Sequence, residues 1–137
     1  MRRRSKARAR ALQALYAWEA QGHPADAERF IHDLGVDDPF VHQLVAAVAA
    51  HRVEIDRHIS DVMPNWRLDR LAAIDRNVLR LGTAELAYVG QAPGPVCIQE
   101  AIQLAERFGT SESPRFVNGV LDAIWRRLRE EGVGIPE

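Results

Sequence analysis

Apolar residues recur at helical spacing along almost the whole chain, and this periodicity constrains the fold more than any other feature. Between Val41 and Val62, for example, the apolar positions fall on one face of a helix. No stretch alternates convincingly between apolar and polar residues, as a half-buried strand would. With 137 residues, 47% of them hydrophobic, the chain can bury a substantial core. We therefore expect an all-α fold in a single domain spanning residues 1–137.

Capping residues and helix breakers divide the pattern into about seven helices. The expected helices run from about Ser5 to Gln21, from Pro24 to Gly35, from the cap Asp38 to Pro64, from Arg67 to Leu71, from Ala72 to Val89, from the 90–95 loop to Gly109, and from Ser113 to Gly132. Because proline cannot continue a helix interior, Pro64 forces a break. Residues 63–67 then form the seam between two halves, about 1–63 and 64–137.

The first ten residues carry six basic side chains and no acidic one. The six are Arg2, Arg3, Arg4, Lys6, Arg8 and Arg10. The remainder holds twelve basic and nineteen acidic residues, so its formal charge is −7. An acidic body with a basic arm indicates a polyanionic partner that binds at one end only.

Cations in the first turns of a helix are unfavourable, because the helix dipole already makes that end positive. A phosphate backbone would offset this cost. Five of the six cations are arginine, which stacks on unpaired bases and forks onto phosphates. Tyr16 could add a stacking surface, although its spacing also suits the core. We therefore predict an RNA-binding arm, with a solubilising tail as the alternative.

No residue pattern indicates catalysis. His51, Glu54 and His58 could place three metal ligands on one helix face, or form an ordinary solvated face. Cys97 is the only cysteine, and its alternatives are a reactive thiol and a small buried apolar residue. Phosphate-binding glycine loops and the short hydrolase motifs are absent. We expect no enzymatic activity, no cofactor and no bound metal.

The single cysteine fits a reducing compartment, because no internal disulfide can form. No apolar run has the length of a signal peptide core or of a membrane span. We expect a cytoplasmic protein that does not interact with membranes.

The carboxy-terminal half carries the most specific motifs. They are Val96 to Ala105, then Arg107-Phe108-Gly109, then Ser113 to Asp122. Two weaker pieces agree with them: Ala14-Leu15-Tyr16 behind the arm, and Ile74 to Arg80 before Glu85-Leu86. With these segments the chain resembles the NusB family of bacterial transcription antitermination factors over nearly its whole length.

The resemblance implies a NusB-like RNA-binding domain made of two small helical bundles packed crosswise. It also implies a function: joint binding of the single-stranded boxA element of ribosomal RNA leader transcripts with NusE, a small-subunit ribosomal protein. The pair would then join an RNA polymerase elongation complex. Some family members form homodimers that hide the RNA surface, so a homodimer is also possible.

The resemblance further implies which residues make contacts. RNA would be bound by the arm from Arg2 to Arg10 and by Tyr16, Glu112, Arg115 and Phe116. The protein partner would be bound by Asp75, Arg76, Val78 and Leu79. Gln99 stands where the family commonly has asparagine, and Pro114 enters a segment that is often more polar. Asn118 and Gly119 have the character of a close approach between helices.

Three other functions stay open on the sequence alone. The first is a helical protein-interaction domain without RNA binding of its own. The second is the RNA-binding appendage of an RNA methyltransferase, because similar domains occur fused to such enzymes. The third is a helix-turn-helix protein that binds duplex DNA.

Overall fold

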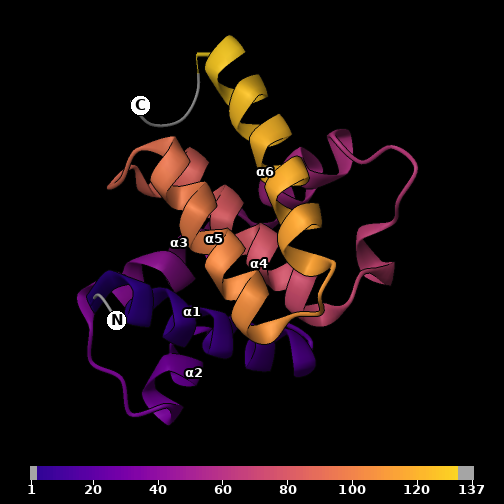
Figure 1. The fold of residues 1–137 in the computed structure, drawn as a ribbon. Helices are drawn as coiled ribbons and strands as arrows, with labels where there is room; N and C mark the ends of the chain where they lie inside the picture. Colours follow the sequence, from indigo (N-terminus) through magenta and orange to yellow (C-terminus); the bar gives the residue numbers. More distant parts are fainter. Residues whose placement is uncertain (1–2, 133–137) are drawn as a thin grey trace.

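The computed structural model describes residues 3–132, which form helices and no strand (Figure 1). The α-helices are α1 (Arg3–Ala20), α2 (Glu28–Asp33), α3 (Pro39–Asp61), α4 (Ala73–Ala84), α5 (Gly94–Phe108) and α6 (Ser113–Glu130). A short 3-10 turn, η1 (Leu68–Arg70), precedes α4, and a π-turn, η2 (Glu85–Val89), follows it. The predicted all-α class is confirmed.

The start of α3 follows directly from its sequence. The Asp38 carboxylate accepts a hydrogen bond from the backbone N–H of Phe40 at 2.9 Å, and Pro39 occupies the first turn. The helix is kinked at His51, whose φ of −119° and ψ of 20° are not helical. The kink lies opposite η2, and the His51 ring stacks on Tyr88 with centroids 3.9 Å apart.

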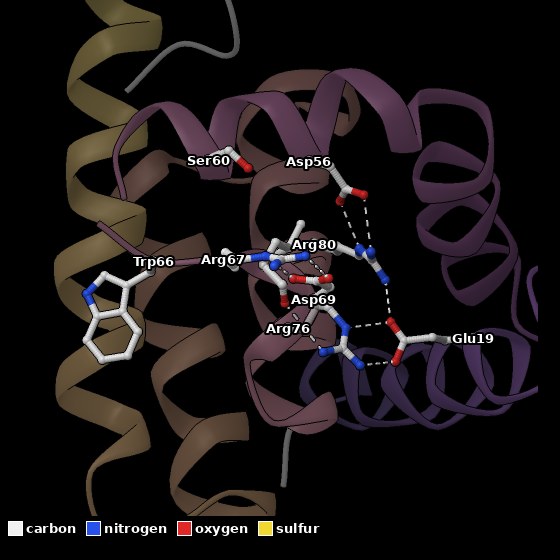
Figure 2. Close-up of a pocket in the computed structure, with 9 residues that line it drawn as sticks. Glu19, Asp56, Ser60, Trp66, Arg67, Asp69, Arg76 and Arg80 are labelled. Carbon is white, nitrogen blue, oxygen red and sulfur yellow. Dashed lines mark hydrogen bonds and ion pairs between the residues drawn. The ribbon is translucent and has the colours of Figure 1, made fainter. Parts of the chain in front are cut away.

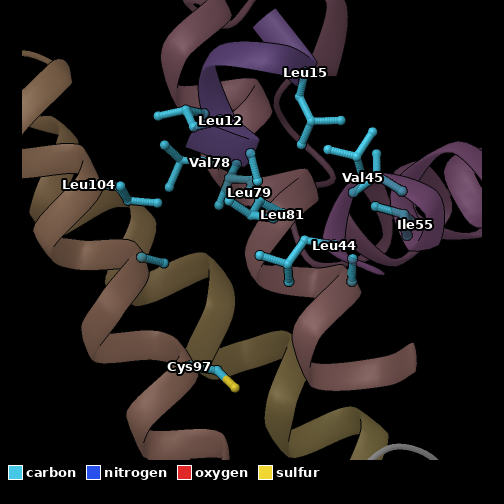
Figure 3. Packing of buried hydrophobic residues seen from close by; sticks show 14 of the residues in the cluster. Leu12, Leu15, Leu44, Val45, Ile55, Val78, Leu79, Leu81, Cys97 and Leu104 are labelled. Carbon is cyan, nitrogen blue, oxygen red and sulfur yellow. The ribbon is translucent and has the colours of Figure 1, made fainter. Parts of the chain in front are cut away.

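Helix α4 is the central element, because it contacts α1, α3, α5 and α6. Every residue from Asn77 to Ala84 is buried. Figure 3 shows Val78, Leu79 and Leu81 of α4 among leucines from α1, α3 and α5. Gly82 allows close packing, since an added Cβ would lie 2.7 Å from Leu121. The apolar residues before and after Pro64 therefore share one core.

The segment expected as one helix from Ala72 to Val89 changes character near its end. It is α-helical to Ala84 and then forms the π-turn η2, which stops at Gly90 with a left-handed φ of +69°. A π-turn shifts the phase of the helix that follows it. Both Glu85 and Leu86 are buried in this turn, and Glu85 becomes available to the arm. None of the helices within residues 3–132 is long and apolar enough to cross a membrane.

Candidate nucleic-acid interface

One face of α1 exposes a row of cations followed by an aromatic ring. The exposed positions of this row are spaced three or four residues apart, as one face of a helix requires. They are Arg3, Lys6, Arg10, Gln13 and Tyr16. From Arg3 to Tyr16 this row, here called the α1 stripe, is about 20 Å long at 1.5 Å per residue. Within residues 3–132, none of its three cations has a hydrogen bond or ion pair with another side chain. Their charges therefore face solvent.

Arg8 lies inside the protein, so the prediction that it contacts RNA is wrong. Its side chain is 4% exposed and binds Glu85, with Nε to Oε1 at 2.5 Å and Nη2 to Oε2 at 2.9 Å. Glu100 accepts from Arg8 Nη1 at 3.2 Å and from the Ser5 hydroxyl at 2.6 Å. The physical reason is the helical period, which places Arg8 on the inner face with Leu12 and Leu15.

The buried pair keeps Arg8 charged. Burial by itself lowers the pKa of Arg8, but the hydrogen bonds that Arg8 donates to Glu85 and the charges of Glu85 and Glu100 outweigh burial and raise it. Arg8 therefore joins α1 to η2 and α5, and it holds the first turns of the arm against the body. Arg2, also predicted to bind RNA, lies outside the described residues.

Arg4 is exposed but held in place. Its Nη2 donates to the Gln91 side-chain oxygen at 2.8 Å, and its guanidinium lies 4.4 Å from the centre of the Phe40 ring. Cation–π contact and hydrogen bonding fix the orientation of the guanidinium plane. Arg4 therefore borders the α1 stripe as an ordered cation.

The other predicted RNA residues gather at the start of α6. Glu112, Arg115 and Phe116 line a hollow of about 440 Å³ together with Trp66 and Asp75. Trp66 is 63% exposed, and its ring centroid lies 6.2 Å from that of Phe116. The structure thus joins the predicted RNA residues and one predicted partner residue in this Trp66 hollow. Asp75 Oδ1 is buried there and has no hydrogen-bond partner in the described part of the chain.

Sequence reasoning missed Trp66. The available signal was a tryptophan directly after Pro64-Asn65, in a segment without apolar periodicity, where a large ring has no helical face to bury. Asn118 and Gly119 were predicted to be a close approach between helices, and this is wrong. Both are exposed, and a Cβ added at Gly119 would meet nothing within 4 Å.

Two of the four predicted partner-binding residues are unavailable to a partner, and a third is engaged by the protein itself. Val78 and Leu79 are 0% exposed in the core, because the inner face of α4 is covered on all sides. Arg76 binds the protein's own groups: Glu19 at 2.5 Å and 2.7 Å, and the Leu71 carbonyl at 2.6 Å. The predictions for Val78 and Leu79 are wrong, whereas Asp75 and Arg76 are both half-buried and reach the surface in part.

Arg76 belongs to an ion-pair network that joins α1, α3 and α4 (Figure 2). Glu19 binds Arg76 and also Arg80 Nη1 at 2.5 Å, and Arg80 reaches Asp56 at 2.8 Å. Burial raises the pKa of Glu19, but its hydrogen bonds and charge interactions with the two arginines outweigh burial and lower it. The network lines a cavity of about 580 Å³. Its two carboxylates and two guanidinium groups sum to zero net charge.

The lowered pKa of Glu19 predicts a loss of stability in acid. Unfolded glutamate titrates near pH 4.3, so the ionised form stabilises the fold above that pH, and the contribution is lost as pH falls through the lower folded pKa. We expect the unfolding free energy to decline more steeply below about pH 4.3 in the unmodified protein than in Glu19→Gln. Urea unfolding between pH 6 and 3 measures both slopes. Glu106→Gln, at an exposed acid on α5, should retain the steep slope, and parallel curves for Glu19→Gln would contradict the prediction.

The residues considered for chemistry do not form a reactive centre. Among residues 3–132, no group of three or more His, Cys, Asp or Glu side chains is placed to hold a metal ion. Cys97 is buried, and burial together with Glu85 raises its pKa to about 12. At neutral pH it is therefore a protonated thiol beside the Arg8–Glu85 pair, not a nucleophile.

Comparison with known proteins agrees with the motifs and the fold. A model of the NusB family matches residues 5–126. The chain belongs to the NusB family. A transcription antitermination protein NusB from Solibacter usitatus is 42% identical over 137 residues, covering 95% of this chain and 93% of that protein. The family resemblance expected from the motifs is thereby confirmed.

Solved NusB structures share the fold. NusB of T. maritima matches with a TM-score of 0.84 and 34% identity over 92% of each chain. Another match, with a TM-score of 0.79 and 28% identity, covers 93% of this chain and 98% of that one, and that structure holds antitermination factors NusB and NusE in complex with double-stranded RNA. The NusB match at residues 5–126 includes Lys6, Arg10, Tyr16 and the Trp66 hollow.

Proposed function

We propose that this chain is a transcription antitermination factor that binds boxA RNA of ribosomal leader transcripts together with NusE, within an RNA polymerase elongation complex. It acts by holding RNA beside a protein partner and not by catalysing a reaction. The observation that carries the proposal is the α1 stripe, whose three cations face solvent without a counter-charge from residues 3–132. The names of its relatives support the same role.

The stripe suits a single strand. The three cations, spaced along about 10 Å of helix at 1.5 Å per residue, attract successive phosphates, and the net acidic remainder of the chain repels a polyanion elsewhere. The exposed rings of Tyr16 and Trp66, with the half-buried Phe116 beside Trp66, offer surfaces on which unpaired bases stack, whereas the bases of a duplex are stacked already. We place Arg4, beside the stripe, and Glu112 and Arg115, in the Trp66 hollow, along the same proposed RNA path. Arg8 holds α1 in place from inside the protein and does not contact the RNA.

The protein partner is proposed to dock next to the RNA at the start of α4. Asp75 supports this placement, because its half-buried side chain brings a carboxylate to the lining of the hollow, where a donor from another protein would bind it. Since Asp75 lines the Trp66 hollow, RNA and NusE would meet there.

Removing two cations of the stripe tests the proposal. We expect Lys6→Ala/Arg10→Ala to weaken binding of a boxA-like single-stranded RNA several-fold. The slope of log affinity against log salt should shrink by up to about 1.4, because each lost phosphate contact removes about 0.7. The melting temperature should not fall, since both side chains are exposed and cations disfavour a helix start. Fluorescence anisotropy across a salt series measures both quantities.

The matched control is Arg57→Ala/Arg127→Ala, which removes the same charge from exposed positions on α3 and α6. It should leave the salt slope nearly unchanged. Equal RNA affinity of the stripe variant and the unmodified protein would remove the stripe from the mechanism. Binding of purified NusE without any measurable RNA binding would instead identify the chain as a protein-interaction domain.

A further inference from the structure

A second polar hollow lies where the α1 stripe begins. Its volume is about 340 Å³, and it is lined by Arg3 and Arg4 of α1, Asp38, Phe40 and Gln43 at the start of α3, and Gln91 from the loop before α5. No sequence motif pointed to this Gln43 hollow, because its residues come from three distant segments. Arg3 belongs both to the hollow and to the stripe, so a strand lying along α1 would reach it.

The hydrogen bonds in the hollow orient its amide groups. Arg4 donates to the Gln91 side-chain oxygen at 2.8 Å, and Gln91 Nε2 donates to Gln43 Oε1 at 2.7 Å. Each amide oxygen thus already accepts a hydrogen bond. No residue within 3–132 accepts a hydrogen bond from Gln43 Nε2, so this amide presents N–H donors to the hollow.

Asp38 supplies the complementary acceptor. Its Oδ1 accepts a hydrogen bond from the backbone N–H of Phe40 at 2.9 Å. Its second oxygen accepts no hydrogen bond from the described residues. Arg3 and Arg4 outnumber Asp38 in the lining, so the hollow also attracts the phosphate next to a bound base. Donors and an acceptor side by side suit the edge of a nucleobase, which carries both kinds of group.

We propose that the Gln43 hollow binds one base of the RNA that lies along α1, and that it prefers bases with a carbonyl next to an imino N–H, which are uracil and guanine. The carbonyl accepts from the Gln43 amide, and the imino group donates to Asp38. Cytosine and adenine have an amino donor in place of the carbonyl and a ring-nitrogen acceptor in place of the imino group. In the same orientation on the strand, their donor would face the Gln43 amide donor and their acceptor would face the Asp38 carboxylate. This inference rests on the proposed RNA binding and adds base preference to it.

Oligouridylate and oligocytidylate of equal length test the preference, because their bases have the same size and differ in these groups. We expect the unmodified protein to bind oligouridylate at least about fivefold more tightly, as one matched base edge provides. Gln43→Ala should abolish most of this difference. Asp38→Asn should also reduce it while keeping the helix cap, since asparagine caps as well as aspartate. Gln43 is exposed, so the melting temperature should stay unchanged.

The control variants separate the two proposals. Gln103→Ala, at an exposed glutamine on α5, should keep the preference, and Lys6→Ala/Arg10→Ala should weaken both RNAs equally. If the unmodified protein binds both RNAs equally, or if Gln43→Ala keeps the difference, the base-binding hollow is overturned while RNA binding stands. If neither RNA binds at low salt, the proposed function itself fails.

Discussion

Replacing Glu85 with alanine is expected to lower the unfolding free energy by about 3 to 5 kcal/mol, because it leaves the charge of Arg8 buried without its main partner. The two side chains are 4% and 3% exposed. In this variant Glu100 would still accept one hydrogen bond from Arg8 at 3.2 Å. Since the same carboxylate also accepts from the Ser5 hydroxyl, it cannot replace both bonds to Glu85. Urea unfolding followed by circular dichroism measures the loss.

The exposed pair Arg67–Asp69 provides the matched control. Its side chains are both 66% exposed and bind at 2.8 Å, so Asp69→Ala should change stability by less than about 1 kcal/mol. The double variant Arg8→Met/Glu85→Leu should recover most of the loss, because well-packed apolar residues often replace a buried ion pair without cost. A loss below about 1 kcal/mol in Glu85→Ala would show that Arg8 reaches water and does not anchor the arm.

Gly94→Ala is expected to lower the unfolding free energy by about 1 to 3 kcal/mol through overpacking. A Cβ at this position would lie 2.3 Å from Trp125 Nε1 and 2.5 Å from Cε2. Both atoms belong to a rigid indole, so the whole ring must move, together with the Arg129 guanidinium that lies 4.9 Å from its centre. Thermal and urea unfolding report the change.

Two further variants identify the cause. The double variant Gly94→Ala/Trp125→Ala should lose less unfolding free energy than the two single variants together, since removing the indole also removes the clash. Gly119→Ala should instead raise stability by about 0.5 to 1 kcal/mol, because this helical glycine has open space around it. Equal effects of alanine at Gly94 and Gly119 would mean that the contact with Trp125 is not restrictive.

The arm combines two roles that the resemblance had treated as one. Arg8 holds α1 in place through Glu85, and the neighbouring Lys6 and Arg10 remain free for a ligand. Under the proposed function, anchoring the first turns in advance would lower the entropy lost when RNA binds, so the buried pair would contribute to binding without touching RNA. The cost of placing cations at a helix start is thus offset partly inside the protein and partly by its ligand.

Local sequence determined the secondary structure of this protein well. The apolar period predicts the long helices, Asp38-Pro39 marks the start of α3, and Pro64 its end, because these signals act within one or two turns. The boundary of α1 was predicted two residues late, since the arm continues the helix to Arg3. The motifs around Val96 to Asp122 also sufficed to place the chain in its family.

Only the tertiary structure decided which residues of the site face a ligand. Arg8 meets Glu85 across 77 positions of the chain, and Arg4 meets Gln91 across 87. A helical period shows that Arg8, Val78 and Leu79 share faces with apolar residues, but not what covers those faces. The sequence therefore predicted a basic arm, and the packing of distant segments divided its cations into an internal anchor and an exposed row.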